Sequence, residues 1–369
     1  MKNLIIVILL SVMAYLGYNV STSAADGLTE EQIAQADRIV NTFMRRYSVP
    51  GLSLAWAKDG EMIMSRAYGV SSSENNIALT TNHLFRIASI SKPITSVLIM
   101  RLVEQGRLSL EDTIFGPQGL LADEYRTKDR NTLLLTVRHL LEHGAGEEWS
   151  NEGDDPMFRQ PVYTHQELIQ WVLDTRPLGR APGTSYHYSN FGYSVLGRVI
   201  EKVTGTSYEA HFLQLLAPLE ISDFKLASNF SSGGNREVQY YSQETMQPYG
   251  LPARRMDAHG GWVTSPSSLV RFLLHVDGFP EQPDILQTAT LNEMTAPGLN
   301  NGNYAKGWSV NQYNNWWHTG SLPGTATVAV RTSDNMVWAV FLNTRSPEPS
   351  FFADLDGLMW QVVRQLGML

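Results

Sequence analysis

The chain has 369 residues, a formal net charge of -8 and no cysteine. Its 43% hydrophobic and 17% charged residues are typical of a globular protein and exclude a disordered or low-complexity chain. The acidic balance argues against nucleic acid as a partner, and the lack of cysteine excludes disulfides, thiolate nucleophiles and thiolate metal sites.

Residues 1–25 have the parts of a secretory signal peptide. A lysine at position 2 precedes an apolar stretch at 4–16, and the small residues around Ala24 and Ala25 suit a cleavage site. An uncleaved membrane anchor is the alternative, but the apolar stretch is shorter than the about 20 residues that span a bilayer. We therefore expect cleavage, a periplasmic or secreted mature chain of residues 26–369, and no membrane partner.

The first elements after this segment are a helix and a hairpin. Thr29-Glu-Glu-Gln32 has the spacing of a capping box and starts a helical apolar period, which predicts a helix over 29–48. Two apolar runs at 52–57 and 62–68 are separated by Lys58-Asp-Gly60, a turn that suits a tight β-hairpin.

The other end of the chain repeats this arrangement in reverse order. Strand-like runs occupy 304–310, 315–318, 325–331 and 337–343, and a final helix follows Ser350 as its expected N-cap. The region between the two ends, about 92–290, is mostly helical in pattern, with long loops.

These elements predict an α+β fold. One antiparallel sheet is built from both termini and covered by the terminal helices, and a mostly helical region is inserted in the middle. We expect a sheet subdomain of about 29–88 plus 257–369 and a helical insert of about 89–256, with a site at their junction.

Ser89 and Lys92 form the first candidate chemical pair. Because proline is tolerated in the first turn of a helix, Pro93 indicates that the apolar pattern ending at Gly106 begins at about Ser89. The serine then lies at the positive end of the helix, with Lys92 one turn further on the same face. A lysine whose pKa is lowered by burial can take the serine proton. A second Ser-x-x-Lys at Ser222 lacks a buried-helix pattern and is interpreted as a solvated turn.

Two further motifs add to this pair. Tyr188 and Asn190 lie on an irregular segment before a helix, and they offer a phenol for proton transfer and an amide for a carbonyl. The run His-Thr-Gly-Ser at 318–321 lies on a predicted strand. It combines a cation-capable ring, hydroxyls and a glycine that allows close approach of a substrate backbone.

The ordered set Ser89-x-x-Lys92, Tyr188-x-Asn190 and His318-Thr-Gly320 resembles the three motifs of the serine β-lactamase and penicillin-binding-protein superfamily, in its class C and low-molecular-weight peptidase branch. The resemblance covers roughly residues 29–366. It implies a β-lactamase/transpeptidase-like fold, and the ordered triple is far more specific than any one motif.

The resemblance also implies a role for each matched residue. Ser89 would attack a substrate carbonyl and form an acyl-enzyme, while Lys92 and Tyr188 would share the general base and acid duties, with the first base left open. Asn190 would hold the acyl-side amide, and Thr319 would bind near the leaving or carboxylate end.

The strand motif supplies the rest of the implied site. The backbone N–H groups of Ser89 and Ser321 would form the oxyanion hole, and His318 and Gly320 would complete the substrate-binding strand. Class C β-lactamases carry a lysine where this chain has His318. A histidine is a weaker, pH-dependent anchor for a substrate carboxylate, so the pattern looks more like that of esterase, D-amino-acid peptidase and mammalian-lactamase-like members.

Metal binding is the main competing interpretation for two features. His139 and His143 are four residues apart, but the glutamate of His-Glu-x-x-His is absent, and we expect structural histidines. The acidic loop 147–155 does not follow a calcium-binding spacing, and we expect it to be solvated. No metal or cofactor is therefore predicted. One or two of the nine tryptophans are expected near the site.

The leading hypothesis is an exported serine hydrolase that acts on an ester or amide. Esterase, D-amino-acid peptidase or carboxypeptidase, and weak β-lactamase activity all remain open, on a small-molecule or peptide acyl substrate. With water excluded and an alcohol or amine admitted, the same site would be an acyltransferase. The alternative from another class is a non-catalytic binding, scaffold or sensor protein, which would have no need for all of Ser89, Lys92, Tyr188 and Asn190.

Overall fold

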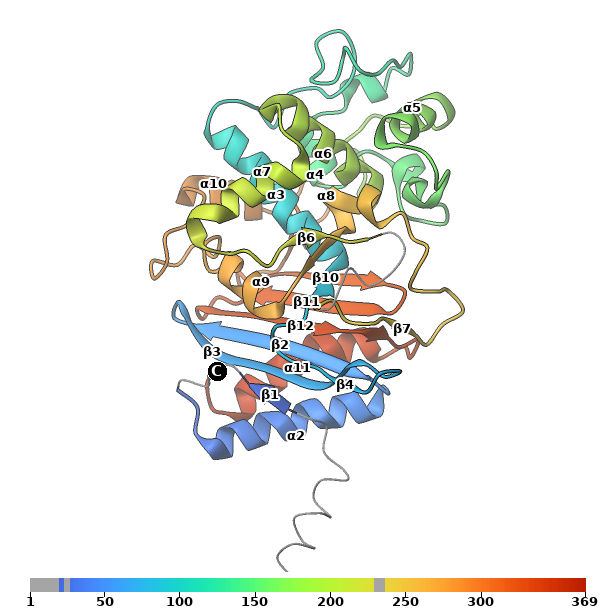
Figure 1. The fold of residues 1–369 in the computed structure, drawn as a ribbon. Coiled ribbons are helices and arrows are strands. Elements are labelled where there is room, and N and C mark those ends of the chain that lie inside the picture. Colours follow the sequence, from blue (N-terminus) through green and yellow to red (C-terminus); the bar gives the residue numbers. More distant parts are fainter. Residues whose placement is uncertain (1–19, 23–26, 229–235) are drawn as a thin grey trace, which may run out of the picture.

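The computed structural model describes residues 20–22, 27–228 and 236–369, and their central feature is an eight-stranded antiparallel sheet (Figure 1). Its strands are β1 (Val20–Thr22), β2 (Gly51–Lys58), β3 (Glu61–Ser72), β4 (Ile77–Ala78), β9 (Ser309–Val310), β10 (Trp316–Leu322), β11 (Thr325–Arg331) and β12 (Met336–Leu342). They lie in the order β1-β3-β2-β12-β11-β10-β9, with β4 paired to β3. Strands from both ends of the chain thus meet where β2 pairs with β12.

Helices cover both faces of this sheet. The terminal helices α2 (Glu30–Arg46) and α11 (Phe351–Gln365) pack on one face, drawn below the sheet in Figure 1. The remaining helices lie on the other side and are α3 (Ser91–Glu104), α4 (Val137–Leu141), α5 (His165–Thr175), α6 (Asn190–Thr204), α7 (Tyr208–Leu216), α8 (Asp257–Gly260), α9 (Pro266–Leu273) and α10 (Thr288–Thr295). None of the helices in the described ranges is long and apolar enough to cross a membrane.

Two small sheets connect the layers. One joins β7 (Tyr241–Ser242) to β13 (Thr344–Arg345), and the other joins β5 (Phe85–Arg86), β8 (Trp262–Thr264) and β6 (Lys225–Leu226). β5 lies shortly before Ser89 in the chain, and its partner β8 follows α8. The second sheet therefore connects the start of α3 to the end of α8.

The central strands divide their side chains between two hydrophobic cores. Along β12, Trp338 and Val340 enter the core under the terminal helices, whereas Ala339 and Phe341 enter the larger core beneath the inserted helices. This is the period of two that a strand imposes on its side chains. Burial on both faces also explains why β12 is a continuous apolar run rather than an alternating one.

The predicted N-terminal elements are confirmed. Thr29 caps α2 by accepting a hydrogen bond from the N–H of Gln32, whose side chain accepts one from the N–H of Thr29. The hairpin β2–β3 turns at Asp59 and Gly60, which both have positive φ, 51° and 77°. The α+β class with a sheet from both termini is likewise confirmed.

Two predictions near the C-terminus are wrong in detail. The run 304–310 is mostly irregular because Gly307, at φ 82°, turns the chain, and only Ser309–Val310 forms a strand. Ser350 precedes α11 but makes no capping hydrogen bond, since its Oγ lies 2.8 Å from the hydroxyl of Tyr47 in α2 instead. The predicted signal segment lies outside the described residues except for 20–22.

Candidate active site

Ser89 occupies a strained turn between β5 and α3. It lies in a single 3₁₀ turn, Ala88–Ile90, rather than in the first turn of the α-helix predicted to start there. Ala88 has a φ of 49°, a left-handed conformation that is costly for a residue with a Cβ atom. The turn leaves Ser89 partly exposed between buried neighbours, at the N-terminal end of a 14-residue helix.

Lys92 lies directly beneath the serine and is fully buried. Its Nζ is 3.2 Å from Ser89 Oγ, 2.7 Å from Asn190 Oδ1 and 3.0 Å from the carbonyl oxygen of His259. Burial lowers the pKa of the Lys92 ammonium well below its usual value, against a smaller opposing effect of the Asp155 carboxylate.

The contacts of Lys92 determine where its lone pair points when the amine is neutral. A neutral amine has two N–H donors and one lone pair, whereas an amide oxygen and a backbone carbonyl can only accept. The two N–H groups therefore go to Asn190 Oδ1 and His259 O. The lone pair is left facing the hydroxyl of Ser89, which is the arrangement that a general base needs.

Tyr188 flanks the same two groups. Its ring centroid is 4.6 Å from Lys92 Nζ. Burial raises the pKa of the Tyr188 phenol, and a hydrogen bond with Ser89 opposes that rise. Because the phenol stays protonated near neutral pH, it suits donation or relay of a proton better than the first abstraction.

The segment that carries Tyr188 and Asn190 is fixed by its backbone. Ser189 caps α6 by accepting a hydrogen bond from the N–H of Gly192, and its own N–H donates to Nδ1 of His143 at 3.0 Å. The N–H of Asn190 donates to the side-chain oxygen of Asn151 at 2.8 Å.

His318 is buried and belongs to a chain of hydrogen bonds. The acceptors in this chain determine which ring nitrogen of His318 carries the proton. Nδ1 lies 2.6 Å from the carbonyl oxygen of Thr319, so Nδ1 carries the proton and Nε2 accepts from the hydroxyl of Tyr304 at 3.3 Å. That hydroxyl accepts in turn from Nε2 of His143 at 3.1 Å. Burial, reinforced by Lys92, lowers the pKa of His318 to about 3.

This environment corrects the expectation of a cationic anchor at His318. A neutral, buried imidazole cannot hold a substrate carboxylate by charge, and its ring nitrogens contact Tyr304 and the Thr319 carbonyl instead. His143 is likewise buried, and His139 caps α4 by pairing with Thr136, so both act structurally here.

Gly320 lets β10 approach the turn that holds Ser89. A Cβ atom at position 320 would lie 2.2 Å from the carbonyl oxygen of Ile87, 2.2 Å from Thr327 Oγ1 and 3.1 Å from the Cβ of Ala88. The glycine therefore makes room for the protein's own backbone, rather than for that of a substrate as the sequence suggested.

The other two residues of this motif are exposed along the same edge. Thr319 and Ser321 alternate with buried neighbours in β10. Ser321 Oγ accepts a hydrogen bond from Arg345 Nη1 at 2.9 Å, and Arg345 is itself ion-paired with Glu244.

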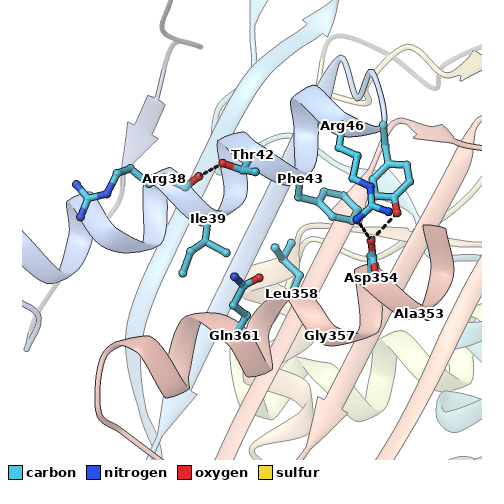
Figure 2. A pocket seen from close by; sticks show the side chains of 11 residues that line it. Arg38, Ile39, Thr42, Phe43, Arg46, Ala353, Asp354, Gly357, Leu358 and Gln361 are labelled. Atoms are coloured by element: carbon cyan, nitrogen blue, oxygen red, sulfur yellow. Dashed lines mark hydrogen bonds and ion pairs between the residues drawn. The ribbon is translucent and has the colours of Figure 1, made fainter. Parts of the chain in front are cut away.

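A cavity of about 270 Å³ opens over Ser89. Of the predicted site residues, Ser89, Asn190 and Ser321 line it, while Lys92, Tyr188, His318, Thr319 and Gly320 do not. Its full lining is Ala88, Ser89, Asn151, Asp155, Phe158, Asn190, Met256, His259, Gly260, Ser321 and Leu322. A larger groove of about 410 Å³ lies between α2 and α11 (Figure 2) and contains none of the predicted site residues.

Sequence reasoning missed Asn151 and Asp155. Both belong to the acidic loop that was expected to be solvated, yet both contact Asn190 and line the cavity. The only local signal was Asp155 before Pro156, which indicates a turn and not a site. No tryptophan is among the described residues that line this cavity, but the carbonyl oxygen of Trp149 accepts a hydrogen bond from the hydroxyl of Ser189, between Tyr188 and Asn190.

An antiparallel sheet with helices inserted over one face, and a Ser-Lys-Tyr cluster at their junction, define the serine β-lactamase and transpeptidase fold class. A model of the Beta-lactamase family matches residues 36–359, and the chain belongs to this family. The predicted membership of the β-lactamase and penicillin-binding-protein superfamily is therefore confirmed.

Several curated relatives are similar to the chain. Esterase EstB of Burkholderia gladioli is 31% identical over 202 residues, covering 52% of this chain and 50% of the esterase. Penicillin-binding protein 4* of Bacillus subtilis (strain 168) is 25% identical over 351 residues, covering 85% and 72%. Protein flp of Staphylococcus aureus (strain MRSA252) is 23% identical over 301 residues, covering 80% and 59%. The chain thus spans only about half to three fifths of the length of the esterase and of flp.

Solved structures show the same fold. D-amino acid amidase from Ochrobactrum anthropi SV3, complexed with L-phenylalanine, superimposes with a TM-score of 0.75 at 22% identity, covering 91% of this chain and 99% of the amidase. The octameric penicillin-binding protein homologue from Pyrococcus abyssi gives a TM-score of 0.71 at 24% identity, covering 91% and 77%.

Proposed function

We propose that this protein is a serine hydrolase that forms an acyl-enzyme on Ser89 and cleaves a small ester or amide. The observation that carries the proposal is the buried Lys92 amine, which is held by Asn190 and the carbonyl of His259 with its remaining position on Ser89 Oγ. A non-catalytic scaffold has no use for a desolvated lysine at a serine hydroxyl.

The reaction begins with the neutral Lys92 amine. It takes the Ser89 proton as Oγ bonds to the substrate carbonyl carbon, and the N–H groups of Ser89 and Ser321 stabilise the resulting oxyanion. The leaving group departs with a proton relayed from Lys92 through Tyr188. Water then attacks the acyl-enzyme, loses its proton to the same pair, and releases the acid and Ser89.

The cavity favours a small, uncharged acyl group. Phe158, Met256 and Leu322 supply apolar walls, and Asp155 places a carboxylate beside them that repels an anionic substrate. Relatives named esterase and D-amino acid amidase support ester or amide cleavage. A penicillin, whose carboxylate finds no charged His318, should react slowly.

Export is a second part of the proposal. The signal-like segment 1–25 supports it. Expression of the full chain in a bacterial host, followed by cell fractionation and intact mass of the product, tests it. A product shortened near Ala24 or Ala25 in the periplasm or medium is expected, and a full-length cytoplasmic product would contradict it.

The catalytic part is tested by steady-state turnover. Wild type and Ser89→Ala are assayed with a short-chain p-nitrophenyl ester, a D-alanyl peptide, a D-amino acid amide and nitrocefin. We expect ester or amide turnover that Ser89→Ala abolishes, with slow or absent nitrocefin cleavage. No turnover of any of the four by wild type would favour the scaffold alternative.

A further inference from the structure

Asp155 has both carboxylate oxygens committed to hydrogen bonds beside the catalytic cluster. One oxygen accepts from the N–H of Met157 at 2.9 Å, as the cap of the short 3₁₀ helix Pro156–Phe158. The other accepts from Asn190 Nδ2 at 2.7 Å. Across the part of the chain that the structure describes, Asp155 forms no ion pair, so its role is not that of a simple salt-bridge partner.

The carboxylate determines which end of the Asn190 amide faces Lys92. An ionised carboxylate only accepts hydrogen bonds, so the amide must turn its NH₂ group toward Asp155. Its oxygen then faces Lys92 Nζ at 2.7 Å. A flipped amide would set two oxygens against each other at Asp155.

The orientation of this amide matters for catalysis because of the lone pair on Lys92. With the amide oxygen toward it, a neutral Lys92 spends an N–H on Asn190 and keeps its lone pair for Ser89. With the NH₂ group toward it, Lys92 would accept from Asn190, and the lone pair would be lost to Ser89.

We propose that Asp155 is a positioning residue that locks the Asn190 amide and thereby aims the Lys92 lone pair at Ser89. This inference rests on the proposed acylation of Ser89. Asp155 touches neither reacting atom, and it acts through Asn190.

The charges around the pair give the proposal a pH signature. The groups that face Lys92 or Asp155, besides each other, are the phenols of Tyr188 and Tyr193, the imidazoles of His143, His259 and His318, and the guanidinium of Arg176. Burial keeps the phenols and imidazoles neutral, since it raises the pKa of the former and lowers that of the latter. The Asp155 carboxylate raises the pKa of Lys92 against the effect of burial, so its removal lowers that pKa further.

The experiment follows the rate at which a fluorophosphonate labels Ser89, by intact mass, across pH 5 to 10. In this reaction the Oγ–P bond forms, fluoride leaves, and the serine proton passes to Lys92. Asp155→Asn offers one acceptor oxygen where two are needed. In the plot of labelling rate against pH, this variant should lower the plateau about 10- to 100-fold. It should also move the acid limb, where the rate falls as Lys92 becomes protonated, to lower pH.

Glu152→Gln is the matched control. It removes the same charge from the same loop, but its side chain is 62% exposed and pairs with His187 rather than Asn190. Its rate should stay within about twofold of wild type, with an unchanged acid limb.

The exchanged pair, Asp155→Asn with Asn190→Asp, separates positioning from folding. It again gives Lys92 an acceptor that cannot flip into a donor, and it places the charge next to the amine. It should recover rate relative to Asp155→Asn and move the acid limb to higher pH.

The outcomes are distinct. Equal profiles for Asp155→Asn and Glu152→Gln, or a rate loss with an unmoved acid limb and a lowered melting temperature, would overturn the positioning role. A wild type that never labels at Ser89 would remove the proposed function itself, and the positioning role with it.

Discussion

The imidazole of His318 shows how strongly burial controls chemistry at single residues of this site. Its model-peptide pKa near 6.5 falls to about 3 in the fold. Between these values the unfolded chain binds a proton at His318 that the native chain does not, so acidification favours unfolding. This contribution to stability is fully present above about pH 6.5 and is lost as pH falls toward about 3.

A His318→Gln variant tests this linkage. Because glutamine cannot titrate, its free energy of unfolding should depend less on pH than that of wild type, by up to about 1.4 kcal/mol per pH unit between pH 6 and 4. Urea unfolding at several pH values measures the slope. Parallel curves for the two proteins would mean that His318 titrates normally in the fold.

The close contacts at Gly320 give a second prediction about a single residue. In Gly320→Ala the new methyl group meets Ile87 O and Thr327 Oγ1 at 2.2 Å, so β10 or the Ser89 turn must shift. We expect a loss of about 1–3 kcal/mol in unfolding free energy and slower acylation of Ser89.

Gly357→Ala is the control for that substitution. Position 357 lies within α11, and apart from its chain neighbours and the backbone of that helix no atom lies within 4 Å of a new Cβ, so alanine should stabilise the helix by about 0.5–1 kcal/mol. A Gly320→Ala variant as stable and as reactive as wild type would contradict the close approach of β10.

Among the elements, α2 has the clearest local cause. Its capping box predicts that Thr29→Ala costs about 0.5–2 kcal/mol in unfolding free energy. Thr42→Ala makes the same change in the middle of the same helix. There the hydroxyl donates back to the carbonyl of Arg38 (Figure 2) and accepts from the exposed Arg45 guanidinium at 3.2 Å, so no backbone N–H loses a cap and the variant should be neutral or stabilising. Urea denaturation measures the free energy of unfolding of both variants. Equal losses of unfolding free energy in the two would rule out the capping role of Thr29.

The elements also show where sequence reasoning succeeds. The helix at Thr29 and the hairpin at Asp59 were predicted because capping and turn signals act within a few residues. The run 304–310 was misassigned because Gly307 breaks it, and Ser350 was expected to cap because its partner Tyr47 is distant in sequence.

At the scale of the whole molecule, the site exists because distant segments meet over the sheet. Ser89 and Lys92 are one helical turn apart and could be paired from the sequence. The carbonyl of His259 and the carboxylate of Asp155 could not, because no local pattern reports where their loops fold. Neutral His318 was also unpredictable, since its pKa depends on burial by other elements.

The proposed hydrolase activity depends most directly on Ser89 being the reactive group. Intact mass after treatment with a fluorophosphonate measures this, on wild type, Ser89→Ala and Ser222→Ala, which alters the second Ser-x-x-Lys motif. We predict one adduct on wild type and on Ser222→Ala, and none on Ser89→Ala. An adduct that persists in Ser89→Ala, or its absence from wild type, would contradict acylation at Ser89.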